Sequence, residues 1–357
     1  MTAPEPPVST PPIRTAELLR VLQRAKQQDD LGVKIASAMA LIQSVLDDLG
    51  ESAVAISFNG GKDCTVLLHL LAAVLLARHS NLPADLAPST ASAAPDAPST
   101  PAGNVVNGHA ASVSSIPLSP PSRQSHDPID PIEGPTTAPP PLPSSTNLSS
   151  SNFPGPSSSN SAPFENPTYS STSTSAAPPH PSSATHHPPH TPHPYPPIKS
   201  VYITAPNPFP SLDAFVLASA ERYGMDLWRF GGGMKAALEE YLGCGGGKGV
   251  KGVLVGTRRG DPNGEVPELA PTDPSWPSFL RVHPILSWSY ADIWTFLREL
   301  DVEWCHLYDE GYTSLGSTIN TVPNPLLRNP SAPGGWDPAW KLLDESQERA
   351  GRLDSSS

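Results

Sequence analysis

The chain has 357 residues, enough for one large domain or two. It contains 47 prolines, 16% charged residues and 6% aromatic residues, so we expect a folded part and an unfolded part. The formal net charge of −12 argues against a nucleic-acid substrate. The first residues show neither a basic start nor an apolar core, and no apolar run is long enough to span a membrane. We therefore expect a cytoplasmic monomer that binds neither nucleic acid nor membrane.

The three cysteines, Cys64, Cys244 and Cys305, lie far apart in the sequence and form no Cys-x-x-Cys pair. Neither a zinc site nor a disulfide framework is indicated by this spacing. An odd number of separated cysteines is typical of a protein from a reducing compartment.

Composition divides the chain into five segments. They are a disordered N-terminus, the first part of a folded domain, a disordered insertion, the second part of the same domain and a tail, at residues 1–13, 14–79, 80–197, 198–352 and 353–357. The insertion holds 28 of the 47 prolines, no lysine and one arginine, Arg123. Such a segment cannot bury enough apolar surface to offset its ordering entropy.

Histidines gather near the end of the insertion, at His180, His186, His187, His190 and His193. A metal site and polar filler are both compatible with this composition. Filler is favoured, because the histidines have no fixed spacing and no carboxylate partner.

Helices and strands alternate in the folded part. Helical spacing of apolar residues predicts helices over 15–30, 33–49, 65–77, 212–223, 234–242, 290–300 and 338–350. Short apolar runs predict strands over 53–56, 200–204, 226–230 and 250–255, and an extended segment over 282–286. The alternation predicts an α/β fold, with helices on both faces of a mainly parallel, Rossmann-like sheet. Ligands of such sheets lie at the carboxyl ends of strands, where Ser57 and Gly256 are expected.

A glycine-containing run, Ser57-Phe-Asn-Gly-Gly-Lys-Asp-Cys64, joins a predicted strand to a predicted helix. Adjacent glycines allow a tight turn and close approach to a ligand. The N–H groups of the turn and of the helix start then suit an anion, and Lys62 adds positive charge. Two glycines alone would indicate an ordinary turn, but the complete run is more specific. It is not a Walker loop, and the run Gly245-Gly-Gly-Lys248 lacks the hydroxyl residue that such a loop needs.

Four further runs combine charged, aromatic and glycine residues, at 256–262, 272–281, 307–316 (followed by 321–325) and 348–352. The first would be a surface salt-bridge turn if it had no function, and the second would be a loop that anchors the core. The last, Glu348-Arg-Ala-Gly-Arg352, places two arginines three apart on the predicted late helix, where they could grip phosphate. Its alternative is a solvated helix end, which the helix dipole favours.

The glycine loop resembles the pyrophosphate loop of the adenine-nucleotide α-hydrolase superfamily, in the branch that holds PAPS reductases and eukaryotic FAD synthases. The downstream runs narrow the resemblance to the fungal-type FAD synthases, whose Gly-x-Arg-Arg-x-Asp-Pro, Thr-Asp-x-x-Trp-Pro-x-Phe, Pro-Ile-Leu-x-Trp-x-Tyr-x-Asp-Ile-Trp, Leu-Tyr-x-x-Gly-Tyr-Thr-Ser-Leu-Gly and Glu-Arg-Ala-Gly-Arg motifs all occur here in order. The match covers about residues 30–79 and 198–352. The long insertion departs from the family pattern and puts the local geometry in doubt.

The resemblance implies an FMN adenylyltransferase, which transfers AMP from Mg-ATP to the phosphate of FMN and gives FAD and pyrophosphate. It implies contact with ATP for Ser57, Asn59, Gly60, Gly61, Lys62, Ile203, Thr257 and Arg258. It implies contact with FMN for Asp273, Trp276 and Arg281. Catalytic roles are implied for Asn59, Asp63, Asp261, Arg349 and Arg352. Asp63 is also the candidate Mg²⁺ ligand, whereas Cys64 fills a Ser/Thr position as a packed residue.

Three other functions are compatible with parts of the sequence. A PAPS reductase would need a nucleophilic cysteine near its C-terminus, yet none follows Cys305. A nucleotide-binding module without catalysis would be expected to lose the charged residues that the loops retain. A scaffold protein would be defined by its Pro/Ser-rich segment alone.

Overall fold

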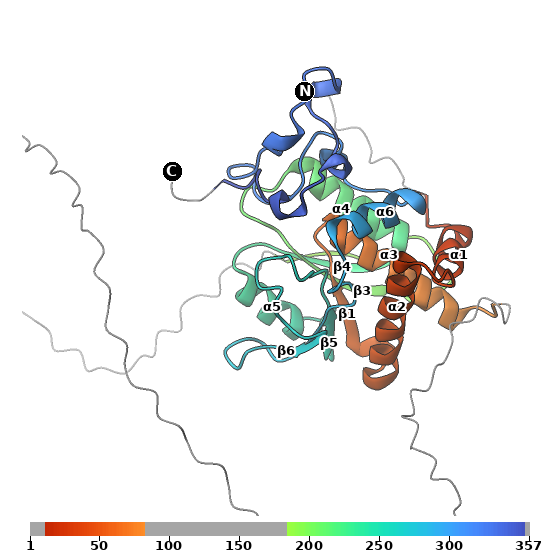
Figure 1. The fold of residues 1–357 in the computed structure, drawn as a ribbon. Helices are drawn as coiled ribbons and strands as arrows, with labels where there is room; N and C mark the ends of the chain where they lie inside the picture. The colour runs from red at the N-terminus through yellow and green to blue at the C-terminus, as the bar shows by residue number, and fades with distance from the viewer. Residues whose placement is uncertain (1–10, 83–183, 354–357) are drawn as a thin grey trace, which may run out of the picture. The chain divides into compact units, whose positions relative to one another are not determined.

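The computed structural model describes residues 11–82 and 184–353, which Figure 1 shows as a coloured ribbon. The strands are β1 Val54–Ser57, β2 Thr185–His187, β3 Ile198–Ile203, β4 Met225–Phe230, β5 Gly252–Leu254, β6 Leu269–Pro271 and β7 Leu280–Val282. The helices are α1 Thr15–Arg24, α2 Asp30–Leu49, α3 Lys62–His79, α4 Pro210–Tyr223, α5 Met234–Gly243 and α6 Tyr290–Glu299. Short 3₁₀ turns are η1 Glu51–Ala53, η2 His306–Tyr308, η3 Pro325–Leu327, η4 Pro333–Gly335, η5 Ala339–Lys341 and η6 Glu345–Gln347. None of the helices described is long and apolar enough to cross a membrane.

The strands form one sheet in the order β2-β4-β3-β1-β5-β7-β6. The five inner strands are parallel, and the edge strands β2 and β6 pair antiparallel with their neighbours. After β1 come β2, β3 and β4, all on one side of it, and the chain then crosses to β5 on the other side. The loops after β1 and β5 therefore diverge at one point of the sheet, which is where such folds bind ligands.

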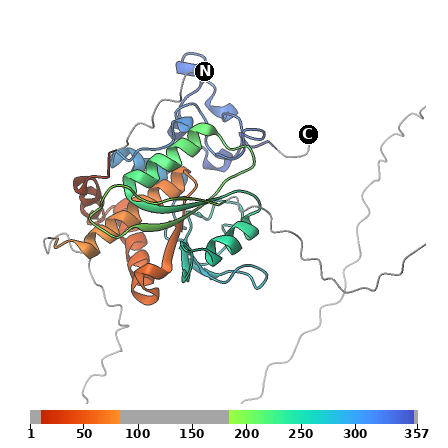
Figure 2. The same ribbon diagram turned by 180° about the vertical axis from the view of Figure 1, so that it is seen from behind.

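Side chains alternate between two apolar layers along the inner strands. Val54 and Ile56 of β1 face the larger core, together with α1, α2, α3, α4 and α6, while Ala55 faces a smaller core with α5. Figures 1 and 2 show this division, with α5 alone on its side of the sheet. The buried strands need helices on both faces, because each face is apolar. The mainly parallel α/β fold predicted from the sequence is confirmed.

Most predicted elements are present, with shifted boundaries. The helix predicted over 15–30 ends at Arg24, so residues 25–29 are not helical, in contrast to the prediction. Asp29 instead caps the next helix, because its side chain accepts a hydrogen bond from the Gly32 amide (2.8 Å). The extended segment predicted over 282–286 is wrong beyond Val282, since the chain turns there and the Leu286 amide donates to the His283 carbonyl (3.2 Å). Strand β6 was not predicted.

The predicted insertion ends too late in the sequence. Residues 83–183 lie outside the described part, but residues 184–197 form structure against the domain. Strand β2 pairs with β4, the His186 ring stacks on Trp228 with 4.3 Å between centroids, and Tyr195 is buried. Composition could not reveal this pairing, because proline and histidine surround the short strand.

The helix predicted over 338–350 is also wrong. This segment contains the separate turns η5 and η6, and Arg352 forms a β-bridge with Thr321. Arg349 and Arg352 therefore do not share a helix face. Contacts with residues 313–324 replace the hydrogen bonds that a helix would have supplied.

The contribution of residues 184–195 to the fold can be tested with two variants in which the same number of residues joins α3 to β3. One lacks residues 93–177, and the other also has 184–195 replaced by Gly and Ser. The second variant loses β2 and the buried Tyr195, so we expect its free energy of unfolding to be lower by at least about 3 kcal/mol. Urea unfolding measures the difference. Equal stability of the two variants would show that 184–195 adds nothing to the fold.

Burial of His69 predicts a stability that depends on pH. Its ring is 1% exposed, its Nδ1 lies 2.8 Å from the Tyr223 hydroxyl, and burial lowers its pKa from 6.5 to about 3. Between these values the unfolded chain binds a proton that the folded chain does not, so stability falls as the pH falls below about 6.5. Between about pH 7.5 and 5.0, His69 lowers the free energy of unfolding by about 2 kcal/mol. Urea unfolding of a His69→Gln variant should show a fall in the free energy of unfolding that is smaller by that amount over the same pH range. A pH dependence equal to that of the wild type would contradict the lowered pKa of His69.

Candidate active site

A cavity of about 260 Å³ lies at the carboxyl ends of β1, β3 and β5. Its walls come from the glycine loop, from the ends of the neighbouring strands and from the C-terminal third of the chain. The lining includes Asn59, Gly61, Lys62, Asp63, Cys64, Tyr202, Ile203, Gly256, Asp261, Tyr308, Gly316, Glu348 and Arg349. Segments far apart in the sequence thus meet where the topology predicts a ligand site.

The glycine loop is held in shape by its own hydrogen bonds. Gly60 has a φ of +74°, and a Cβ atom there would lie 2.8 Å from Leu212, so only glycine fits. The Gly61 amide donates to Asn59 Oδ1 (2.9 Å), and the Lys62 amide donates to the hydroxyl of Tyr308 (3.0 Å). Two of the N–H groups expected to meet phosphate therefore already have partners within the protein.

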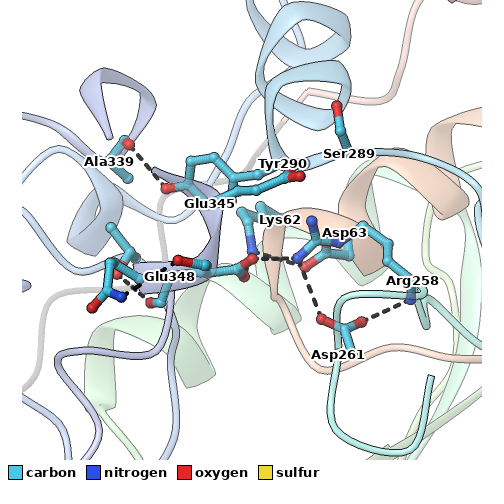
Figure 3. A network of polar contacts seen from close by, with 12 residues as sticks. Lys62, Asp63, Arg258, Asp261, Ser289, Tyr290, Ala339, Glu345 and Glu348 are labelled. Carbon is cyan, nitrogen blue, oxygen red and sulfur yellow. Dashed lines mark hydrogen bonds and ion pairs between the residues drawn. The ribbon is translucent and has the colours of Figure 1, made fainter. Parts of the chain in front are cut away.

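A network of buried ion pairs lies beside the loop (Figure 3). Lys62 Nζ contacts Asp63 Oδ2 (3.0 Å) and Glu348 Oε1, while Arg258 Nε lies 2.7 Å from Asp63 Oδ1. Arg258 also contacts Glu348 Oε2 (2.5 Å) and Asp261 Oδ1 (3.3 Å). The two cationic side chains are only 2% and 4% exposed. Three carboxylates surround two cations, so the network carries a formal charge of −1.

The protonation states follow from burial and from these charges. Burial disfavours the charged form of Lys62, but Asp63 and Glu348 outweigh it and raise the pKa of the ammonium. Burial likewise opposes ionisation of Asp63, yet Lys62 and Arg258 lower the pKa of its carboxyl below the ordinary value. The pKa of Asp261 is raised, chiefly by burial. Lys62 and Asp63 are therefore both charged at neutral pH.

Residues 313–324 hold the C-terminal segment against the cavity. The Thr313 hydroxyl donates to the Glu348 carbonyl (2.6 Å), and the buried Asn324 amide group donates to the Gln347 carbonyl (2.8 Å). The Val322 amide donates to the Gly351 carbonyl (2.9 Å). The motif that ends in Thr-Ser-Leu-Gly, together with the residues after it, thus holds the Glu-Arg-Ala-Gly-Arg motif in place. The sequence alone did not reveal this contact between the two motifs.

Arg349 and Arg352 take different positions. The Arg349 side chain is exposed and lines the cavity, whereas Arg352 packs over Gly316, where an added Cβ atom would lie 2.2 Å from its Nη2. Burial, and then the charge of Arg349, lower the pKa of Arg352. Neither arginine forms an ion pair with any residue that the structure describes. Their positive charge is therefore not neutralised by a neighbouring carboxylate, in contrast to the charges of Lys62 and Arg258.

The three residues expected to contact FMN lie away from this cavity lining. Asp273 and Trp276 belong to the turn between β6 and β7, at the amino end of β7, where the Trp276 amide donates to the Asp273 carbonyl (2.8 Å). Trp276 packs beside the smaller core, and Arg281 Nη2 donates to the Pro271 carbonyl (3.1 Å). Contact of these residues with FMN stays a prediction.

The expected ATP residues are only partly brought together. Asn59, Gly61, Lys62 and Ile203 line the cavity, whereas Ser57, Gly60, Thr257 and Arg258 are not part of its lining. Asp261 contacts Arg258 through its side chain and also accepts a hydrogen bond from the Arg258 amide (2.7 Å), while its catalytic role stays a prediction. Sequence reasoning missed Glu348 and Tyr308 as site residues. Both stand inside motifs already singled out, but no local spacing shows that they reach Lys62.

Two of the three cysteines, Cys64 and Cys305, lack the low pKa of a redox thiol. Burial raises the pKa of Cys64 to about 12, and burial also raises the pKa of Cys305. Their thiols are therefore protonated at neutral pH and poor nucleophiles. Cys64 packs against the larger core, which agrees with the packed role expected for it.

No group of three or more His, Cys, Asp or Glu side chains within residues 11–82 and 184–353 could hold a metal ion. Asp63 Oδ1 is nevertheless buried without a hydrogen bond, despite its ion pair with Arg258. A role of Asp63 in holding Mg²⁺ therefore stays a prediction.

Comparison with known proteins gives consistent similarities. The family model "Phosphoadenosine phosphosulfate reductase domain" matches residues 232–323. A probable FAD synthase of Schizosaccharomyces pombe is 41% identical over 157 residues, which are 43% of this chain and 57% of that protein. The flavin adenine dinucleotide synthase of Saccharomyces cerevisiae is 31% identical over 205 residues, covering 44% of this chain and 66% of that protein. The chain thus spans less than two thirds of the length of these relatives.

Solved structures show the same fold. The FMN adenylyltransferase of Candida glabrata has a TM-score of 0.57 at 18% identity, covering 96% of both chains. The same enzyme solved with FMN and the ATP analogue AMPCPP has a TM-score of 0.56 at 18% identity, with the same coverage. The expected resemblance is confirmed: the matched part of the chain is similar in sequence to fungal FAD synthases, and the chain has the fold of the FMN adenylyltransferase structures.

Proposed function

We propose that the protein is an FMN adenylyltransferase, which forms FAD and pyrophosphate from FMN and Mg-ATP. The observation that carries the proposal is one cavity in which the glycine loop, the loop after β5 and Arg349 converge. The similarity to FAD synthases supports it, because their names give this activity. Small-molecule substrates and a monomeric, cytoplasmic protein are part of the proposal.

The reaction needs no protein nucleophile. A phosphate oxygen of FMN attacks the α-phosphorus of ATP, and the bond from this phosphorus to the pyrophosphate oxygen breaks. The leaving pyrophosphate takes the electron pair. The protein has only to align the two substrates and to offset their negative charge. This requirement agrees with protonated thiols at Cys64 and Cys305.

Positive charge for the phosphates is expected mainly from the arginines of the C-terminal segment. Lys62 and Arg258 are already neutralised by Asp63, Asp261 and Glu348, and they are nearly buried. Arg349 has no such partner among the described residues and lines the cavity. Mg²⁺ would arrive with ATP, with Asp63 as a candidate ligand, and would neutralise phosphate charge.

The first test is FAD formation by the purified full chain. We expect chromatography to show FAD only when FMN, ATP and a divalent metal are all present. Absence of FAD, together with reduction of PAPS by a thiol donor, would overturn the proposal in favour of the oxidoreductase.

Asp63 provides a more local test. We expect Asp63→Asn to lower turnover by more than about tenfold, equal to about 1.4 kcal/mol of barrier, because it unbalances Lys62 and Arg258 beside the phosphates. Asp47→Asn is a matched control, since Asp47 is exposed and pairs with Arg78 (2.6 Å) far from the cavity lining. Steady-state kinetics of the two folded variants give the comparison. Equal turnover of both variants would remove Asp63 from the site.

A further inference from the structure

Glu348 joins the C-terminal segment to the glycine loop. Its carboxylate contacts Lys62 with one oxygen and Arg258 with the other, and its side chain is 13% exposed. Lys62 begins α3 directly after the glycine turn, whereas Arg258 lies in the loop after β5. One side chain therefore ties three separate parts of the chain together.

The backbone of Glu348 is fixed as well. Its carbonyl accepts a hydrogen bond from Thr313 (2.6 Å), and Thr313 accepts one from Asn324 (3.0 Å). The segment is not part of an α-helix, so helical hydrogen bonds do not determine its position. Glu348 is therefore held both by its side chain and by its carbonyl.

The next residue, Arg349, lines the cavity and has no ion pair with a described residue. A long, exposed side chain can reach many positions unless its backbone is fixed. We propose that Glu348 is a positioning residue, which acts on adenylyl transfer by holding Arg349 where the phosphates react. This inference rests on the proposed function and deepens it by giving a role to Glu348, the one charged residue of the motif at 348–352 to which the sequence analysis gave none.

The negative charge of the network predicts how a Glu348→Gln substitution affects kcat and the KM for ATP. Glu348→Gln keeps the size of the side chain but removes one negative charge near the site of the triphosphate. Binding of ATP should therefore not weaken, whereas the reacting phosphates lose a fixed Arg349. We expect kcat to fall by at least about tenfold, while the KM for ATP stays equal or falls.

The chain offers a matched control on the same segment. Glu345 accepts a hydrogen bond from the Tyr290 amide (2.9 Å), and no contact joins it to Lys62 or Arg258 (Figure 3). Glu345→Gln should lower the melting temperature about as much as Glu348→Gln and should leave kcat within about twofold. A similar fall of kcat in both variants would mean that any loosening of the segment suffices, and would overturn the specific role of Glu348.

A double-mutant cycle tests whether Glu348 acts through Arg349. We expect Arg349→Ala to lower kcat about 100-fold in the wild-type background but less than about tenfold beside Glu348→Gln. Full additivity of the two losses would overturn the inference. If Glu348→Gln does not fold, as judged by circular dichroism, Glu348→Asp takes its place, because it keeps the charge and shortens the reach.

The wild-type protein separates the two proposals. If it makes no FAD, the proposed function fails. If it makes FAD and the cycle is additive, only the role of Glu348 fails.

Discussion

The site depends on the cost of burying two cations. Lys62 and Arg258 are almost inaccessible to water, and such charges are strongly unfavourable unless carboxylates contact them. Asp63 comes from the first turn of α3, Asp261 from the loop after β5, and Glu348 from the C-terminal segment. Because the carboxylates that contact these cations come from distant segments, three parts of the chain meet at one place, and the cavity lies beside it.

The sheet explains why this meeting point suits phosphate chemistry. The loops after β1 and β5 diverge at the carboxyl ends of adjacent strands, which leaves space for a ligand. Within this space the buried network is slightly negative, whereas Arg349 is an unpaired positive charge among the described residues. The network therefore fixes geometry, and the arginine can respond to a negatively charged substrate. This division of roles fits a reaction in which two phosphates must approach each other.

Local patterns predicted much of the fold and only part of the site. The glycine loop could be recognised because Gly60 needs a positive φ and adjoins a strand and a helix. The pairing of Glu348 with Lys62 could not, since 286 residues separate them and no periodic pattern relates them. Residues 338–350 have helix-forming composition, but the contacts of Thr313 and Asn324 prevail over that tendency. Strand β2 escaped prediction because its partner strand, rather than its own composition, determines it.

The ion pair of Glu348 with Lys62 fastens the C-terminal segment to the glycine loop. Hydrogen exchange in the Glu348→Gln variant tests it most directly, at the amides of Val322 and Leu353, which bond to Gly351 (2.9 Å) and Asn320 (2.9 Å) across the segment. We expect both amides to exchange at least about tenfold faster than in the wild type, while the exchange of the amides of β1 and β3 is unchanged. Unchanged exchange at Val322 and Leu353 would contradict it.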